Sequence, residues 1–472
     1  MPPAVAPAFV STVSAARPLP APVSAQTRLT YVLGHFWQAY EPRLPVCIGE
    51  VGGVGVEVEV ADGAANFFAG TAPQPVAPVW RTWRGQRLPF FFTENEDSEL
   101  LTRLSGRAAI NVDIISAAFY LLSGWQEYFS QDQDAHGRFP YAASVQRRYD
   151  FVAVPVVNYY FDLLKTAIEH VTGRALTLRG WPGGAPLAAF ISHDIDLLRG
   201  GWKAPVKRAL RQGRWAEALT RLSRLRQSRG AWNNLEHVAA QTARYGGKST
   251  FFILPCPHPA PDGTPNANYR LGPRLRARLR ALAAQGHEIG LHGSIGSSLN
   301  ARQLATEQQR LPGPPARGHR FHYLKWDPRR TPLVLDKVGF DYDTTLGFAE
   351  HFGFRNSYCH PFQPFNFATH SAHRFLEIPL LLMDVTLHHP CYLQLSAEQV
   401  LPALRPALAQ VEQFGGVAGI LWHNNHFDPE NVVNGPAQFH ELMRDLQQRG
   451  AAFLTGTETA TWYQREAPTA HS

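Results

Sequence analysis

Two carboxylates and a histidine follow directly after a run of small apolar residues in AAFISHDIDLLRG, residues 188–200. The apolar run predicts a buried strand, and residues two apart on a strand point to the same side, so Asp194 and Asp196 face one cavity. Two carboxylates in one cavity repel each other unless a cation or a shared proton lies between them. A divalent metal resolves this conflict, because one carboxylate ligates it and the other stays free as a base for a metal-activated water. An Asp-x-Asp pair also arises by chance, at helix caps, and in sugar-nucleotide transferases, where it holds a metal on a diphosphate.

Further side chains of the right chemistry follow later apolar runs. GHEIGLHGSIGS ends a strand on His292, HRFHYLKWD supplies Arg320 and His322, and ILWHNNHFD supplies His423 and His426. Histidine is the commonest metal ligand at neutral pH, although a lone histidine at a strand end is more often structural. The shared position at strand ends predicts one composite site.

The elements that must position these residues alternate between strand and helix. After RGWPGGAP, residues 179–186, strands are expected at LAAFISHD, KSTFFILP, HEIGLH, RFHYLKW, RFLEIPLLLMD, VAGILWH and AAFLTG, with helices between them. Such alternation predicts a parallel sheet with helices outside, either open or closed into a barrel. In these folds the chemistry lies just beyond the carboxyl ends of the strands.

The length of 472 residues predicts two domains rather than one core. RGWPGGAP marks the expected boundary between them. The chain is thus divided into a disordered leader at 1–30, an N-terminal α+β accessory domain at 31–182, and a second domain at 187–465. Within the accessory domain, helical spacing is clearest at 113–129 and 154–171.

Composition excludes several classes of protein. Cys47, Cys256, Cys359 and Cys391 form no CxxC pair, which indicates free thiols in a reducing compartment. The proline-interrupted N-terminus has no basic region typical of a signal peptide, and no apolar run reaches membrane-spanning length. We therefore expect a cytoplasmic protein. The net charge of +7 is modest for this length and does not favour nucleic-acid binding.

The positive charge is concentrated in one segment. Between Lys203 and Arg229 the chain carries nine Lys/Arg and a single Glu, with leucines and Trp215 close to one helical face. One interpretation is an amphipathic helix in peripheral contact with an anionic membrane surface. The other, which we favour at this point, is an outer helix that covers the sheet.

The order SHDID, KSTFF, GHEIGLH, RFHYLKW, DYDTTLGF and ILWHN resembles the polysaccharide deacetylase family, carbohydrate esterase family four with its NodB homology. The resemblance covers roughly the second domain. It implies a distorted (β/α) barrel that removes N-acetyl or O-acetyl groups from sugars with a divalent metal, usually Zn²⁺. The region before Gly180, with DIISAAFYLLSGWQEYF and HGRFPYAAS, is similar to an N-terminal domain attached to a bacterial subgroup of these proteins.

The resemblance also implies roles for matching residues. Asp194 becomes the base and Asp196 a metal ligand, since the HDID spacing is similar to the peptidoglycan-deacetylase-like and allantoinase-like branch. GHEIGLH makes His292 a second ligand, and ILWHN makes His423 the general acid. The family's RxPxG arginine motif is absent, but Arg320 can still orient Asp194 as part of the catalytic set.

One departure concerns the third metal ligand. The family places a second histidine four residues after the first, and that position is Gly296 in this chain. Hydrolysis at zinc requires three protein ligands and a water. His322 is the first candidate for the missing ligand and His193 the second.

Other residues are expected around this centre. Tyr323 and Trp326 can offer an apolar face to a sugar ring and Asn424 can contact the substrate, although ordinary core or rim positions explain the aromatic residues equally well. Asp343, Asp384 and His193 are expected to support the histidines from behind.

Three functions remain open at this stage. The first is a metal-dependent hydrolase that deacetylates a carbohydrate, with a metal-activated water, an aspartate base and a histidine acid. The second is a catalytically inactive deacetylase-like protein that binds a carbohydrate or a partner, which Gly296 favours. The third is a metal amidohydrolase acting on a small non-sugar amide, which would need a closed pocket rather than an elongated groove.

Overall fold

The computed structural model describes residues 21–64, 66–94, 99–201, 203–216, 219–220, 231–429, 431 and 435–465. Most of the expected leader, residues 1–20, lies outside this part. Helix α1 (Ala25–Ala39) nevertheless begins within the range 1–30, and the Ser24 side chain caps it by accepting from the Thr27 amide. The folded chain thus starts earlier than the expected boundary at residue 31.

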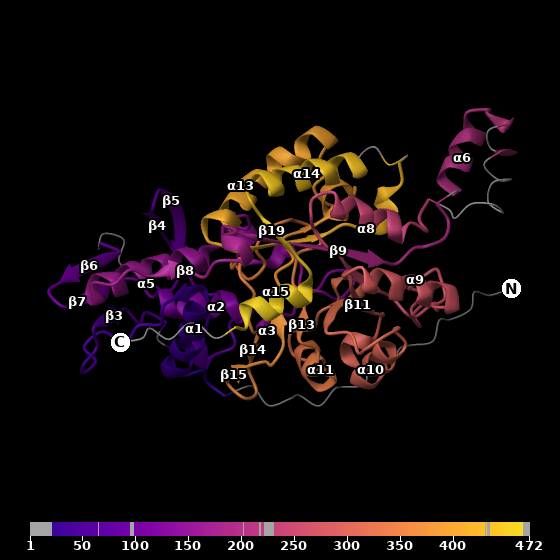
Figure 1. Ribbon diagram of the computed structural model, residues 1–472. Helices are drawn as coiled ribbons and strands as arrows, with labels where there is room; N and C mark the ends of the chain where they lie inside the picture. Colours follow the sequence, from indigo (N-terminus) through magenta and orange to yellow (C-terminus); the bar gives the residue numbers. More distant parts are fainter. Residues whose placement is uncertain are drawn as a thin grey trace, which may run out of the picture.

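The N-terminal region has α+β architecture, as expected (Figure 1). Strands β2, β3, β7 and β6 form one mixed sheet in that order, and helices α5 and then α2 and α1 pack in succession beside it. Strand β1 pairs with β8 and strand β4 with β5, both antiparallel. The elements after α1 are β1 (Tyr40–Glu41), β2 (Ile48–Glu50), β3 (Val58–Val60), η1 (Phe67–Ala69), β4 (Val79–Trp83), β5 (Gln86–Phe90), β6 (Leu101–Leu104), β7 (Arg107–Ile110), α2 (Ile114–Leu122), α3 (Trp125–Phe129), η2 (Tyr141–Ala143), α4 (Val145–Arg148), α5 (Val156–Thr172), β8 (Thr177–Leu178) and η3 (Pro182–Gly184).

The helical run expected at 113–129 is two helices. Gly124 adopts a φ of 69° between α2 and α3, a left-handed conformation that glycine tolerates and that stops the first helix. Asp113 caps α2 by accepting from the Ser116 amide. The break lets α3 carry Glu127 toward the second part of the chain.

The second part alternates strands and helices. Its elements are β9 (Ala188–Ile195), α6 (Lys203–Arg211), α8 (Leu235–Ala243), β10 (Thr250–Ile253), α9 (Pro273–Ala284), β11 (Glu288–Gly293), η4 (Ser297–Leu299), α10 (Ala301–Gln309), β12 (Gly318–Phe321), η5 (His322–Leu324), α11 (Thr331–Val338), β13 (Tyr342–Asp343), β14 (Phe365–Asn366), β15 (Ser371–Ala372), β16 (Leu376–Glu377), β17 (Leu382–Met383), α12 (Asp384–His388), α13 (Ala397–Gln413), β18 (Val417–Leu421), η6 (Asn424–Phe427), α14 (Pro436–Gln448), β19 (Ala452–Leu454) and α15 (Gly456–Tyr463).

The main sheet is parallel and strongly curled. Its strand order is β16-β13-β12-β11-β10-β9-β18-β17, with β19 beside the first half of β9. The two end strands, β16 and β17, are separated by only residues 378–381, which span at most about 18 Å. Eight strands laid flat would separate them by roughly 34 Å. The sheet must therefore curl until its edges approach each other, which confirms a distorted (β/α) barrel.

Pro379, inside the run RFLEIPLLLMD, lies in the link between the two edges of the sheet. The sequence predicts one strand here, but proline has no amide hydrogen and the run splits into β16 and β17 at opposite ends of the strand order. A Cβ on Gly419 of β18 would lie 2.1 Å from the Pro379 carbonyl oxygen, so only glycine allows this approach. Leu381 then donates its amide to the Gly419 carbonyl at 2.9 Å.

The two parts of the chain share one hydrophobic core. A single cluster of buried residues includes Phe119 and Tyr160 of the N-terminal region together with Ile191 and Trp422 of the barrel. Arg355 donates to both carboxylate oxygens of Glu127, at 2.8 and 2.6 Å, in a fully buried ion pair between the two parts. The accessory region is thus fused to the barrel rather than tethered to it.

Among the described residues, no helix is both long enough and apolar enough to cross a membrane. The four cysteines form no disulfide. The basic segment lies partly outside the described residues, but helix α6 stands away from the barrel, beyond α8 (Figure 1). The described part therefore does not cover the sheet, contrary to the interpretation favoured from sequence.

Candidate metal centre and active site

The residues singled out for chemistry gather at the carboxyl ends of strands β9, β11 and β12 of the main sheet. Asp194 lies near the end of β9 and Asp196 directly follows that strand, whereas His292 lies on β11 and Arg320 on β12. The parallel register places His292 opposite Arg320. His322 follows β12 at once, in the short helix η5. The sheet thus brings together residues that are far apart in the sequence.

Three of these side chains form a candidate metal centre. His292 Nε2 lies 3.4 Å from Asp196 Oδ1 and 3.2 Å from His322 Nδ1, and His322 Nδ1 lies 3.5 Å from the same Asp196 oxygen. Ligands at 2.0–2.1 Å from a tetrahedral zinc ion are separated by about 3.4 Å. Asp196 Oδ1 is buried and has no hydrogen-bond partner. The donor set and its spacing therefore fit a zinc-like cation.

Hydrogen bonds behind the two imidazoles aim their free nitrogens at this centre. His292 Nδ1 lies 2.9 Å from the Arg320 carbonyl, and His322 Nε2 lies 3.2 Å from the Pro265 carbonyl. A carbonyl only accepts, so each of these nitrogens carries the proton and the other nitrogen presents a lone pair. Burial lowers the pKa of both imidazoles to about 4, so they are neutral ligands at physiological pH.

The second candidate ligand, His193, is not part of this centre. Strand alternation turns it to the opposite side of β9 from Asp194, where Nδ1 bonds the Trp422 carbonyl at 2.7 Å and Nε2 the Ser249 hydroxyl at 3.1 Å. Gly296, at the position where the sequence resemblance implies a second metal histidine, has a φ of 93°. A histidine at that position would be strained, so this loop is built for glycine.

Asp194 is the carboxylate beside the candidate metal ligands. Its Oδ1 accepts from Arg320 Nη1 at 2.9 Å, and its Oδ2 lies 3.5 Å from His292 Nε2. Burial alone raises the pKa of Asp194, but the charge and hydrogen bond of Arg320, together with the charge of His423, hold the pKa below its usual value. Asp194 is thus ionised at neutral pH and held in one orientation.

Asp384 supports two histidines at once. Its Oδ1 accepts from His423 Nδ1 at 2.7 Å and its Oδ2 from His426 Nδ1 at 2.5 Å, while the His423 amide donates to Oδ2 at 2.7 Å. Burial opposes charge on His423, but the Asp384 carboxylate outweighs it and raises the pKa of His423 to about 9. His423 Nε2 lies 3.7 Å from Asp196 Oδ2. His423 and Asp194 line the same pocket, so a protonated imidazole and an ionised carboxylate are both available there for acid and base roles.

A half-enclosed pocket of about 340 Å³ is lined by Asp194, Asp196, His292, His322, His423 and His426. Apolar side chains such as Leu324, Met383 and Leu421 form part of its wall. Tyr323, which the sequence predicts to contact substrate, also lines it and adopts a φ of 58°. The pocket thus combines a polar floor with an apolar wall, which is typical of a small-molecule site.

The N-terminal region supplies one side of the pocket, which sequence reasoning missed. His136 stacks on Tyr323 with ring centroids 4.9 Å apart. Arg138 forms an ion pair with Asp134 at 2.6 Å and donates to the Tyr323 carbonyl at 2.8 Å. Lys325 donates to the His136 carbonyl. HGRFPYAAS was noted only as a feature of the accessory domain, and nothing in its sequence indicates that it reaches the barrel.

Three predicted residues lie elsewhere. Trp326 is buried in the main core and does not line the pocket. Asn424 is fully buried, and its amide donates to the Leu197 and Trp232 carbonyls at 2.8 and 2.7 Å, whereas its neighbour Asn425 lines the pocket. Asp343 accepts from His319 at 2.7 Å and contacts none of the site histidines. These side chains serve packing and loop anchoring.

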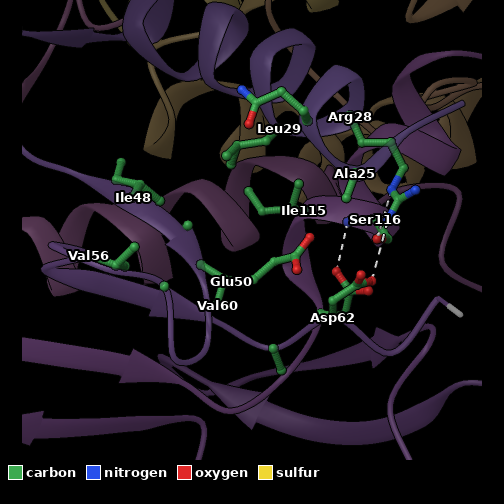
Figure 2. Close-up of a pocket in the computed structure, with 15 residues that line it drawn as sticks. Ala25, Arg28, Leu29, Ile48, Glu50, Val56, Val60, Asp62, Ile115 and Ser116 are labelled. Atoms are coloured by element: carbon green, nitrogen blue, oxygen red, sulfur yellow. Dashed lines mark hydrogen bonds and ion pairs between the residues drawn. The ribbon is translucent and has the colours of Figure 1, made fainter.

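A second pocket, of about 410 Å³, lies in the N-terminal region between α1 and strands β2 and β3 (Figure 2). The Arg28 side chain donates to the Ser116 hydroxyl at 3.2 Å and to Asp62 at 3.3 Å. Asp113 accepts amide hydrogens from Gly63 and Ser116. These charged groups hold the start of α1 against α2.

Comparisons with known proteins give the following similarities. A family of unknown function (DUF7033) matches residues 56–173. No curated protein matches the chain. Among solved structures, a putative polysaccharide deacetylase from Mycobacterium smegmatis is 17% identical, with a TM-score of 0.41, over 62% of this chain and 96% of the other. A probable polysaccharide deacetylase from Pseudomonas aeruginosa PAO1 is 15% identical, with a TM-score of 0.41, over 61% and 94%. A Puue allantoinase is 16% identical, with a TM-score of 0.39, over 60% and 92%.

Proposed function

We propose that this chain is a metal-dependent hydrolase of the polysaccharide deacetylase type that removes acetyl groups from an N-acetylated or O-acetylated carbohydrate. The observation that carries the proposal is the triangle of Asp196 Oδ1, His292 Nε2 and His322 Nδ1, with edges of 3.2 to 3.5 Å. The ionised Asp194 and the protonated His423 flank this triangle.

Asp196, His292 and His322 would hold the cation. When bound, a zinc-like ion supplies a Lewis acid that polarises the acetyl carbonyl and makes water acidic enough to lose a proton near neutral pH. Because all three ligands come from a rigid sheet end and its first turn, they are positioned before substrate binds.

The remaining groups move protons. Asp194, fixed by Arg320, accepts a proton from the attacking water. His423, kept protonated by Asp384, donates a proton to the leaving amine or alcohol. The pocket wall formed by Tyr323 and the N-terminal loop excludes solvent on one side and offers a flat aromatic contact to a sugar ring.

The test combines metal content with activity. The purified protein should bind about one zinc or similar ion per chain, and it should release acetate from acetylated amino-sugar oligomers or acetylated xylan. Asp196→Ala should lose both metal and activity, whereas Asp194→Asn should keep the metal and lose roughly 100-fold or more in kcat. An unaltered protein that binds no metal after reconstitution would refute the hydrolase and leave a carbohydrate-binding role.

The bounded shape of the pocket favours a second candidate, an amidohydrolase acting on a small non-sugar amide. His136 and Arg138 close one side, so the site is not an open-ended groove along its whole length. Acetate release from a sugar oligomer separates the two candidates, because a small-amide enzyme would hydrolyse only the small substrate.

A further inference from the structure

The basic segment leaves the barrel at the rim of the candidate active site. Leu197, one residue after Asp196, lines the pocket, and the chain returns at Trp232. The Asn424 amide binds the carbonyls of Leu197 and Trp232 together, and the Asn424 carbonyl accepts from Asn234 at 2.9 Å. Both ends of the excursion are therefore tied to the residue that follows His423.

The described part of this excursion exposes an unusual number of large apolar side chains. Eight such side chains are exposed in the described parts of the chain, and three of them fall within ten positions here: Leu210 at 38%, Trp215 at 65% and Leu219 at 65%. Trp215 and Leu219 are four positions apart, and each lies in helical backbone. Several large apolar side chains exposed within one short segment mark a candidate interaction surface.

Positive charge accompanies these apolar groups. Lys207, Arg211 and Arg214 are exposed in the same stretch. The segment 203–229 has nine Lys/Arg against one Glu, so its charge complements an anionic partner. Together with Figure 1, in which α6 stands clear of the barrel, this gives a projecting, cationic and apolar surface, which we call the basic arm (the described residues of 203–220).

We propose that the basic arm binds the surface of an anionic lipid bilayer and brings the mouth of the candidate active site to it. Tryptophan and leucine insert at the boundary between headgroups and acyl chains, and lysine and arginine attract anionic headgroups. A nucleic acid would satisfy the charges but would leave Leu210 and Leu219 without a partner. Resting on the proposed function, the substrate is then a carbohydrate displayed at the bilayer, as on a glycolipid.

The binding test uses the full chain and vesicles. We expect sedimentation with phosphatidylcholine vesicles containing about one third phosphatidylglycerol, and none with pure phosphatidylcholine. Two double variants should each weaken binding about tenfold or more. One combines Trp215→Ser with Leu219→Ser, and the other combines Lys207→Glu with Arg211→Glu. Leu333→Ser, which removes an exposed leucine on α11, is the matched control and should bind like the unaltered protein. Equal thermal unfolding midpoints will show that the variants are folded.

The outcomes separate this proposal from the proposed function. Asp196→Ala should bind vesicles normally, since the basic arm does not depend on the metal centre. Trp215→Ser with Leu219→Ser should slow hydrolysis of an N-acetylated glycolipid in anionic vesicles but not of a soluble acetylated sugar. If neither the glycolipid nor the soluble sugar is hydrolysed, the proposed function fails. The vesicle-binding results still test whether the basic arm binds lipid. Absence of vesicle binding would refute the proposal that the basic arm binds a lipid bilayer. So would binding that is lost only in the Lys207→Glu with Arg211→Glu variant and is competed by an oligonucleotide.

Discussion

The Nδ1 atom of His322 lies 3.2 Å from the Nε2 atom of His292, although 30 positions separate the two residues in the chain. Adjacent parallel strands place one histidine at a strand end and the other in the turn that follows the next strand. Position 296, where the sequence resemblance implies a second metal histidine, is Gly296 in this chain. The third donor of the candidate metal centre thus comes from the turn after a neighbouring strand.

His322 is expected to be essential for metal binding. His322→Ala should weaken zinc affinity at least about 100-fold, because the centre keeps only two protein ligands. Competition with a chromogenic chelator measures this directly. His193→Gln is the control, since His193 faces the opposite side of β9 and should leave affinity unchanged. Full zinc affinity in His322→Ala would mean that another residue completes the centre.

The alkaline limit of activity should report the His423–Asp384 pair. In the proposed function His423 is the protonated acid, so kcat/KM should fall as pH rises through its pKa of about 9. Asp384→Asn removes the charge that raises this pKa, so the alkaline fall in kcat/KM should move toward about pH 6.5. In His426→Gln, Asp384 still bonds His423, so the alkaline fall in kcat/KM should not move to lower pH. An alkaline fall in kcat/KM that occurs at the same pH in Asp384→Asn would show that another group limits the reaction.

His193 should make the fold sensitive to acid. Burial lowers its pKa to about 4, below the value of an unfolded chain, so the unfolded state binds the proton first. The stabilisation is complete above about pH 6.5 and decreases by about 3 kcal/mol as pH falls toward 4. Urea unfolding of the protein and of His193→Gln across this range should show a smaller pH dependence in the variant. Parallel curves for the two proteins would exclude His193 as the cause.

Arg138 is expected to position the third ligand from the N-terminal region. It donates to the Tyr323 carbonyl in the left-handed turn just after His322, so Arg138→Ala should lower zinc affinity by about tenfold. Arg329→Ala is the matched control, because Arg329 also joins the two regions, through the Tyr128 carbonyl at 2.7 Å, but lies outside the pocket lining. Lower stability in Arg138→Ala with unchanged zinc affinity would limit Arg138 to a structural role.

Much of the barrel and the position of its chemistry could be predicted from local pattern. The alternation of strands and helices after residue 187 predicts a parallel sheet, and parallel sheets collect strand ends at one edge. The two-residue spacing of Asp194 and Asp196 fixes them on one side of β9 whatever surrounds them. Residue type and periodicity are local properties, so they can be recognised from the sequence alone.

Tertiary structure decided which side chains meet. Alternation along β9 already turns His193 away from Asp194 and Asp196, but only the placement of β12 beside β11 brings His322 to His292. The split at Pro379, the sharing of Asp384 by two histidines and the arrival of His136 and Arg138 at the pocket all depend on contacts between distant segments. Such contacts arise from three-dimensional packing and chain closure, which no local spacing encodes.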